Sequence, residues 1–219
     1  ESASLLANIQ EQGPAVQNSK SEHMFWLILS VAIWGSVHSL MASLKFKDML
    51  RRTLGSNGVK FYRLFYNVFS VISIAPIFYL MITLPDQDFY QIPPPWSYLM
   101  FAGSGISVLL LFVTVLQTDV LSFVGLRQLF QEEQPGKLVT RGFYRMVRHP
   151  LYTFGLLALW LSSSVSLNAF IVYVGLTLYI LVGIYFEERK LLREFGQAYA
   201  DYQSVTPMLI PGLKFGGNK

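Results

Sequence analysis

The chain has 219 residues, of which 53% are hydrophobic and 14% are charged, whereas soluble domains carry about a quarter of their residues charged. This composition favours a membrane protein over an ordinary soluble enzyme. The 17 Lys and Arg residues exceed the 13 Asp and Glu residues, and the absence of cysteine excludes a disulfide framework, a thiolate metal site and a cysteine nucleophile.

The first 23 residues are polar and end in His23-Met24, directly before an apolar run. They lack the basic start and the apolar core of a signal peptide. We interpret residues 1–23 as a tag or a disordered extension that precedes a native start at Met24. Residues 24–219 are then expected to form a single domain.

Four apolar regions follow along the chain. A bilayer core about 30 Å thick is crossed by roughly 20 apolar residues in a helix. Residues 24–44, 61–84 and 97–117 each predict one span. Residues 150–186 are too many for one span, and the polar stretch 162–168 predicts a turn near their middle. We therefore expect an all-α integral membrane protein with about five transmembrane helices, the last two forming a hairpin.

The positions of the basic residues test this arrangement. Lys and Arg gather on the cytoplasmic side of membrane proteins. With five spans, every Lys and Arg except Lys20 falls on one face. This places the N-terminus outside and the C-terminus in the cytoplasm. Because the basic excess then reports orientation, no nucleic-acid partner is expected.

Two segments outside the spans have an amphipathic pattern. In residues 187–202, apolar side chains recur at helical spacing opposite charged ones, which predicts a helix along the cytoplasmic face. Residues 119–130 predict a short interfacial piece, with Arg127 in an otherwise apolar setting.

The densest group of ionisable residues flanks the predicted hairpin. Folding the hairpin about residue 167 places His149 level with Tyr185 and near Glu187 and Glu188. Ionisable groups at a membrane boundary are costly unless they are paired or functional. This cluster is therefore the main candidate site.

Charges of opposite sign divide this cluster. Pro150 favours the first helical position, so a helix N-terminus lies beside Arg145 and Arg148 and suits a carboxylate or phosphate. Glu187 and Glu188 opposite suit an ammonium group or ribose hydroxyls. A ligand that has both a carboxylate and an ammonium, such as an amino acid, matches this division. The alternative is that the two glutamates pair with neighbouring arginines as a structural clamp.

Polar side chains also occur within the first two spans. His38 in the first span and Asn67 in the second are candidate substrate contacts, although a packing role for His38 is an alternative. His38 and His149 are the histidines after residue 23, and neither has a second ligand at metal spacing. No metal site is expected.

The C-terminal part of the chain resembles a known superfamily. The sequence Arg-His-Pro-Leu-Tyr at 148–152, followed by the glutamate pair 187–188 and then Tyr199, resembles the signature of the isoprenylcysteine carboxyl methyltransferase and phospholipid methyltransferase superfamily. The block at 119–129 resembles the branch that contains methanethiol S-methyltransferases and NnrU-like proteins. Met208 stands where the prenylcysteine enzymes tend to have Arg, which argues against their substrate.

The resemblance implies that S-adenosylmethionine binds within residues 118–219, between the hairpin and the C-terminal helix. The implied activity is methyl transfer to a small hydrophobic thiol such as methanethiol, in contact with the lipid bilayer and with no obligate protein partner. Together with the charge pattern, the resemblance gives the candidate cofactor contacts Arg145, His149, Tyr152, Tyr185, Glu187, Glu188, Tyr199 and Tyr202.

Methyl transfer to a thiol needs alignment and a way to favour the thiolate. Arg127 or Arg148 would lower the pKa of the thiol, and Asp119 or His149 would accept its proton. These four residues are the candidate catalytic groups.

Three alternatives stay open. NnrU-like relatives include carotenoid isomerases that use haem, for which His38 and His149 would serve as axial ligands. A methyltransferase of this superfamily could instead act on a prenylcysteine or a phospholipid. A membrane scaffold without activity would bind no cofactor.

Overall fold

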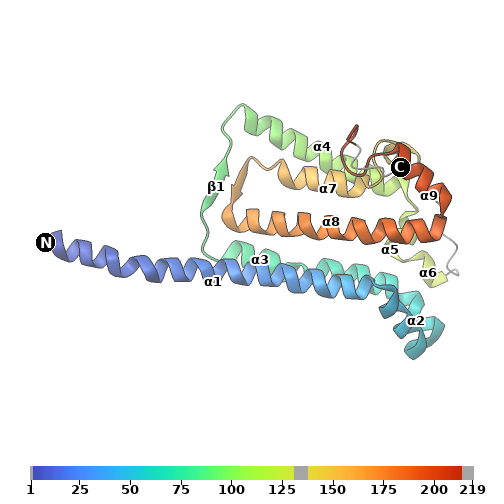
Figure 1. The fold of residues 1–219 in the computed structure, drawn as a ribbon, viewed down its shortest axis with the longest axis horizontal. Helices are drawn as coiled ribbons and strands as arrows, with labels where there is room; N and C mark the ends of the chain where they lie inside the picture. The colour runs from blue at the N-terminus through green and yellow to red at the C-terminus, as the bar shows by residue number, and fades with distance from the viewer. Residues whose placement is uncertain (1, 131–137, 214–219) are drawn as a thin grey trace.

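The computed structural model describes residues 2–130 and 138–213. Long helices lie side by side, and a pair of short strands closes one end (Figure 1). In chain order the elements are α1 (Ser2–Ala42), α2 (Leu44–Ser73), α3 (Ala75–Thr83), β1 (Asp88–Gln91), α4 (Trp96–Gln117), α5 (Val120–Val124), α6 (Arg127–Phe130), the 3₁₀ helix η1 (Gly142–Arg145), α7 (Pro150–Trp160), β2 (Ser164–Ser166), α8 (Leu167–Phe195) and α9 (Gln197–Val205).

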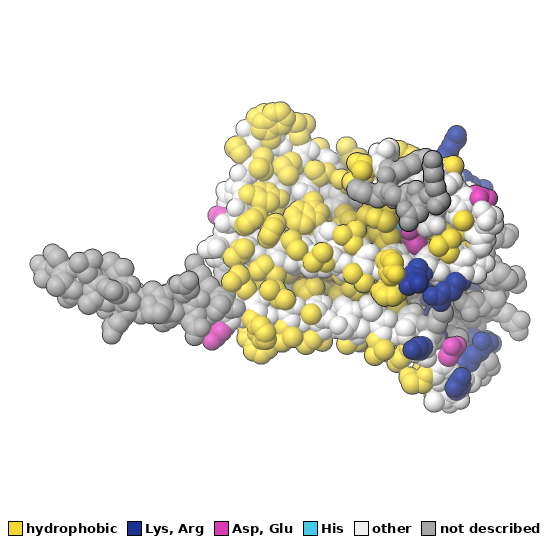
Figure 2. All heavy atoms as spheres, viewed as in Figure 1, with side chains coloured by type: hydrophobic (Ala, Val, Ile, Leu, Met, Phe, Trp, Pro, Cys, Tyr) yellow, Lys and Arg dark blue, Asp and Glu magenta, His cyan; other side chains and the backbone are white. Residues whose placement is uncertain are grey.

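Four helical segments in the described ranges are long and apolar enough to cross a membrane. They are Glu22–Ala42, Lys60–Thr83, Trp96–Gln117 and Leu167–Phe195. Their outer faces stay exposed, as for Phe101, which is 80% exposed, so the surface suits lipid rather than water. Figure 2 shows apolar side chains along the sides of the bundle and the visible Lys and Arg side chains at one end. The prediction of an all-α, multi-pass membrane protein is confirmed.

The fourth predicted span is shorter than expected. Helix α7 has 11 residues and, at 1.5 Å per residue, is about 16 Å long, roughly half of a bilayer core. The predicted turn at 162–168 is present, but part of it is strand. Residues of β2 pair with β1 in an antiparallel ribbon, with Gln91 opposite Ser164. This pairing takes residues that would otherwise lengthen α7.

Helix α8 extends further than the sequence pattern predicted. It runs without a break through 29 residues, so residues 187–195 continue the last span and do not begin a separate amphipathic helix. The break comes at Gly196, which has a φ of +55°, a conformation that favours glycine. The expected boundary was wrong because no residue near Glu187 interrupts the helix.

The segment 119–130 forms two short helices against α2. Gly125 joins them with a φ of +96°. A Cβ atom at Gly125 would lie 2.6 Å from the backbone nitrogen of Leu64, so only glycine permits this approach to α2. Asn67 of α2 donates a hydrogen bond of 2.8 Å to the carbonyl of Val124. The predicted interfacial piece is therefore tied to the second span.

The two ends of the bundle differ in character. A buried apolar cluster of Leu27, Val31, Ile77 and Val172 joins α1, α3 and α8. The strand ribbon closes one end, and α9 with the short helices lies at the other (Figure 1).

The backbone of residues 2–23 is helical and continues into the first span. The interpretation of residues 1–23 as a tag or a disordered extension stays a prediction. The single domain over residues 24–219 also stays a prediction. Three lysines of the predicted cytoplasmic face lie outside the described residues: Lys137, Lys214 and Lys219.

Candidate functional site

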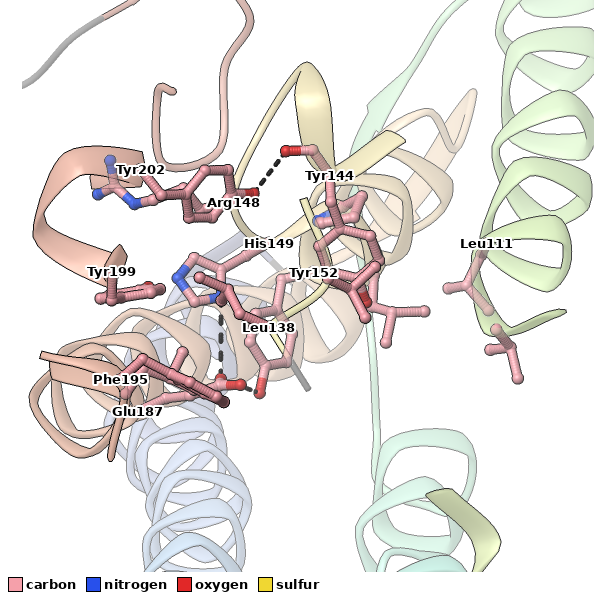
Figure 3. A pocket seen from close by; sticks show the side chains of 15 residues that line it. Leu111, Leu138, Tyr144, Arg148, His149, Tyr152, Glu187, Phe195, Tyr199 and Tyr202 are labelled. Carbon is pink, nitrogen blue, oxygen red and sulfur yellow. Dashed lines mark hydrogen bonds and ion pairs between the residues drawn. The ribbon is translucent and has the colours of Figure 1, made fainter. Parts of the chain in front are cut away.

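A cavity of about 510 Å³ lies at the end of the bundle where α7 begins (Figure 3). Its walls come from α4, the chain before α7, α7 itself, α8 and α9. This volume is typical of small-molecule sites. The apolar part of the lining includes Leu111, Val115, Leu138, Leu191 and Phe195. The polar part includes Tyr144, Arg148, His149, Tyr152, Glu187, Tyr199 and Tyr202.

The start of α7 is fixed by the segment that follows α9. The backbone N–H groups of Arg148 and His149 donate to the carbonyls of Pro207 and Met208, at 2.9 and 3.2 Å. Pro150 occupies the first helical position and His149 the N-cap position, as the sequence predicted. The C-terminal segment therefore fixes the two residues that lead into the helix.

Arg148 and Glu188 form a nearly buried ion pair, with side chains 11% and 16% exposed. The Nε of Arg148 lies 2.6 Å from Oε1 of Glu188, and its Nη1 donates to the carbonyls of Thr206 and Gln203. The other oxygen of Glu188 accepts a hydrogen bond of 3.1 Å from Gln203. The alternative of a structural clamp is thus supported for this pair, since it joins the start of α7 to α8 and α9.

His149 lies between the two glutamates and is 5% exposed. Its Nε2 is 3.1 Å from Glu188, and its Nδ1 is 3.8 Å from Glu187. The hydroxyl of Tyr152 donates a hydrogen bond of 3.0 Å to Glu187, and the Tyr152 ring stacks on His149 (Figure 3). The carboxylate of Glu187 stays 42% exposed in the cavity wall. It is therefore the negative group that a ligand in the cavity can reach.

Three tyrosines from α9 and η1 line the cavity. Tyr202 donates a hydrogen bond of 2.5 Å to the carbonyl of Tyr144, which ties α9 to η1. Burial raises the pKa of Tyr202 and of Tyr144 to about 12, so both hydroxyls stay protonated at neutral pH. Tyr199 is 1% exposed, and its hydroxyl has no hydrogen-bond partner among the residues that the structure describes. Because buried polar groups are normally paired, this hydroxyl is a candidate ligand contact.

Three predicted cofactor contacts do not line the cavity. The carboxylate of Glu188 faces Arg148, His149 and Gln203 instead. Tyr185 is 56% exposed, and its hydroxyl accepts a hydrogen bond from Arg189 on the outer side of α8. It precedes Glu187 by two residues, which is about 200° around a helix, so the two side chains point in different directions. Arg145 is exposed in η1 and is also absent from the lining.

Asp119 and Arg127 bind each other outside the cavity. Their ion pair is 2.8 Å long, and both side chains are 42% exposed. Desolvation opposes ionisation of Asp119, but hydrogen bonds from Ser122 and the charge of Arg127 hold the pKa of its carboxyl below the usual value. Asp119 also caps the N-terminus of α5. This pair orders the short helices beside α2.

The two predicted substrate contacts lie on the first two spans and face different neighbours. Nε2 of His38 is 2.5 Å from the hydroxyl of Tyr66. Asn67 anchors α5 through Val124, as described above. Neither His38 nor Asn67 lines the 510 Å³ cavity.

The sequence reasoning missed several residues of the site. Leu191 and Phe195 follow Glu187 at intervals of four along α8, so helical spacing could have found them. Gln203 and Thr206 contact Arg148 through their backbone carbonyls, for which the sequence carries no signal.

The apolar helices and the cavity at one end, which has both apolar and polar walls, define a multi-pass helical membrane protein with a ligand-sized site. The family model described as "NnrU protein" matches residues 26–213, and the chain belongs to this family. It is 30% identical over 212 residues to the methanethiol S-methyltransferase of Crocosphaera subtropica, covering 90% of this chain and 80% of the relative.

Further relatives carry the same name. Methanethiol S-methyltransferase 2 of Bradyrhizobium diazoefficiens is 29% identical over 191 residues, covering 85% of this chain and 72% of the relative. The methanethiol S-methyltransferase of Mycobacterium tuberculosis is 24% identical over 189 residues, covering 84% and 76%. No solved structure gives a significant match.

Proposed function

We propose that this protein is an S-adenosylmethionine-dependent membrane methyltransferase that methylates a small apolar thiol such as methanethiol. The proposal depends on one observation: Glu187 and Tyr199 line the same ligand-sized cavity. Glu187 has a partly exposed carboxylate, and the hydroxyl of Tyr199 has no hydrogen-bond partner among the described residues. The names of the similar proteins support the reaction and the substrate class.

The cavity residues fit the chemistry of S-adenosylmethionine. Glu187 would accept hydrogen bonds from the ammonium group or from ribose hydroxyls, and Tyr199 would donate one to a ligand oxygen or nitrogen. The faces of Tyr144 and Tyr152 suit a sulfonium, which is a cation without hydrogen-bond donors. Leu191 offers an apolar surface to the adenine. When bound, S-adenosylmethionine supplies an electrophilic methyl carbon and leaves as S-adenosylhomocysteine.

Arg148, His149 and Glu188 would act mainly by positioning. The guanidinium of Arg148 is already bonded to Glu188 and to two carbonyls, so it holds α9 over the cavity. His149 lies between two carboxylates and orients Glu187 toward the ligand. A catalytic role for Asp119 or Arg127 stays a prediction, and their mutual ion pair favours a structural one.

We also infer that the cavity end faces the cytoplasm, with the N-terminus outside. The Lys and Arg side chains visible in Figure 2 lie at this end, as the positive-inside rule requires.

A binding and activity assay tests the proposal. The purified full chain, in detergent or nanodiscs, should bind S-adenosylhomocysteine in calorimetry. It should transfer label from S-adenosylmethionine to methanethiol and short alkyl thiols, in preference to a prenylcysteine or phosphatidylethanolamine. The thiol assignment fails if only the prenylcysteine or the phospholipid is labelled. A protein that binds no S-adenosylhomocysteine would indicate a scaffold.

The haem alternative has its own readout. A haem protein would purify red with a Soret absorption band. Both ring nitrogens of His149 face glutamate oxygens, so axial ligation would require these contacts to break. The geometry thus favours the methyltransferase proposal.

A matched pair of variants tests Glu187. Glu187→Gln removes the charge that faces the cavity, and Glu194→Gln removes one from the exposed side of the same helix. A hydrogen bond to a charged group contributes about 1.5–3 kcal/mol, so affinity for S-adenosylhomocysteine should fall roughly 10- to 100-fold in Glu187→Gln alone. Equal affinity in the two variants would remove Glu187 from the site.

A further inference from the structure

The walls of the 510 Å³ cavity differ in chemistry from one side to the other. The charged and hydroxyl-bearing side chains of the lining come from η1, α8, α9 and the chain around the start of α7. Helix α4 contributes Leu111 and Val115, which lie one turn apart and share one face of that helix. In Figure 3, Leu111 lies on the side of the cavity opposite Glu187 and Tyr199. The α4 side is therefore apolar, whereas the α8 and α9 side is polar.

Helix α7 lies between these two sides and presents a different residue to each. The hydroxyl of Tyr152 donates to Glu187 of α8. Leu151 precedes Tyr152 by one residue, which turns its side chain about 100° around the helix. Gly155 follows one turn later on the face of Leu151, and a Cβ atom at Gly155 would lie 3.5 Å from Cδ1 of Leu111. Leu151 therefore faces α4. We define the apolar half of the cavity by three of its lining residues: Leu111, Val115 and Leu151.

Close packing of α4 on α7 limits the apolar half at one end. Ser104 of α4 donates a hydrogen bond of 2.9 Å to the carbonyl of Ala158 of α7. A Cβ atom at Gly103 would lie 3.1 Å from Cδ1 of Leu161. Between these residues the two helices leave no space for a long carbon chain. Leu111 is the α4 residue of the lining that lies nearest to this contact, so the apolar half ends there.

Resting on the proposed methyltransferase function, we propose that the apolar half holds the acceptor thiol and that Leu111 limits the length of its carbon chain. Glu187 and Tyr199 would hold the polar groups of the cofactor on the other side. Methyl transfer requires the acceptor sulfur in line with the methyl carbon, on the side away from the sulfonium. The apolar half is the wall that lies opposite Glu187 and Tyr199, and it offers a thiol apolar contacts. Its closed end restricts the acceptor to a short alkyl chain.

The first experiment shortens the side chain that limits the acceptor. Leu111→Ala removes three carbons, which is also the difference between methanethiol and 1-butanethiol. The ratio of kcat/KM for 1-butanethiol to kcat/KM for methanethiol should therefore rise about 10- to 100-fold. Leu109→Ala is the matched control, because Leu109 is exposed on the outer face of the same helix, and its ratio should stay within about twofold of the parent ratio. Affinity for S-adenosylhomocysteine should change in neither variant.

The second experiment fills the apolar half and decides the question if Leu111→Ala does not fold. Val115→Phe places a larger side chain in the space proposed for the thiol. It should lower kcat/KM for methanethiol about tenfold or more, while affinity for S-adenosylhomocysteine stays within about twofold. Leu116→Phe is the control, because Leu116 is the next residue and is exposed on the outer face of α4. Both quantities should stay at the parent values in Leu116→Phe.

Two results would overturn this inference and leave the proposed function intact. Equal thiol preference in Leu111→Ala and Leu109→Ala would show that Leu111 does not limit the acceptor. A loss of affinity for S-adenosylhomocysteine in Val115→Phe, but not in Leu116→Phe, would assign the apolar half to the cofactor. If the parent protein instead binds no S-adenosylhomocysteine and methylates no thiol, the proposed function fails, and the inference fails with it.

Discussion

Arg148 and Glu188 stand forty positions apart in the sequence, and their side chains meet at 2.6 Å between the start of α7 and the last turns of α8. Gln203 and Thr206 complete the network from the far side, so one ion pair joins three helical elements around the cavity.

Removing one partner of this pair should destabilise the protein. Glu188→Ala leaves the guanidinium of Arg148 without its counter-charge in a nearly buried site, which costs about 3 kcal/mol of unfolding free energy. Denaturant titration in detergent measures this loss. Glu194→Ala, on the exposed side of α8, should change the same quantity by less than about 0.5 kcal/mol. Equal stability of the two variants would contradict the prediction.

Tyr199→Phe should separate ligand binding from folding. The hydroxyl has no hydrogen-bond partner among the described residues, so its removal should leave the stability of the ligand-free protein unchanged or slightly raised. If the hydroxyl bonds the cofactor, affinity for S-adenosylhomocysteine should fall about 3- to 10-fold, as expected for one lost hydrogen bond. Calorimetry and thermal melting of the same sample check both. A variant with lower stability and unchanged affinity for S-adenosylhomocysteine would contradict the prediction.

The stability of the α9 contact should fall at high pH. The folded-state pKa of Tyr202 is about 12, mainly because of burial, whereas a tyrosine in the unfolded chain ionises near 10. Its contribution is therefore fully present below pH 10 and is lost as the pH rises toward 12, about 2 kcal/mol in all. Melting curves between pH 8 and 12 should show this decline. Tyr202→Phe should lower the stability at pH 8 and make the decline between pH 8 and 12 less steep. If the decline is equally steep in this variant, the buried hydroxyl of Tyr202 does not cause it.

Gly142→Ala should disturb the chain that leads into the cavity. Gly142 has a φ of +64°, and a Cβ atom there would lie 2.2 Å from the Gln117 side chain, whose oxygen accepts a hydrogen bond from the N–H of Phe143. Backbone strain and the lost hydrogen bond should together cost about 2 kcal/mol of unfolding free energy. Gly183→Ala, a helical position with open space around it, should be neutral or slightly stabilising. Denaturant titration measures the unfolding free energy of both variants. Similar values for Gly142→Ala and Gly183→Ala would contradict the predicted backbone strain at Gly142.

Part of the site could be predicted from the sequence because a helical hairpin has a fixed relation between sequence position and depth. Two helices joined by a turn must bring residues at equal distances from the turn to the same depth, and this placed His149 opposite Glu187 and Glu188. Proline chemistry located the start of α7 at Pro150. Tyr185 was placed wrongly relative to the cavity because depth along a helix does not fix the direction around it.

Other contacts depended on partners that no local pattern reveals. Asp119 and Arg127 each had a plausible chemical role, but the chain folds them onto each other. The unpartnered hydroxyl of Tyr199 could be recognised only after every neighbour was in place.

The sequence by itself determined that the protein lies in a membrane, where its four long apolar helices are, and the depth of its charged cluster, because hydropathy and helix length act residue by residue. It did not determine the length of α7, because the pairing of β2 with β1 is a tertiary contact. Only the tertiary structure decided which cluster residues face the cavity and which bind each other. Hydrogen bonds and ion pairs require distances near 3 Å between groups far apart in the chain, and packing alone fixes those distances.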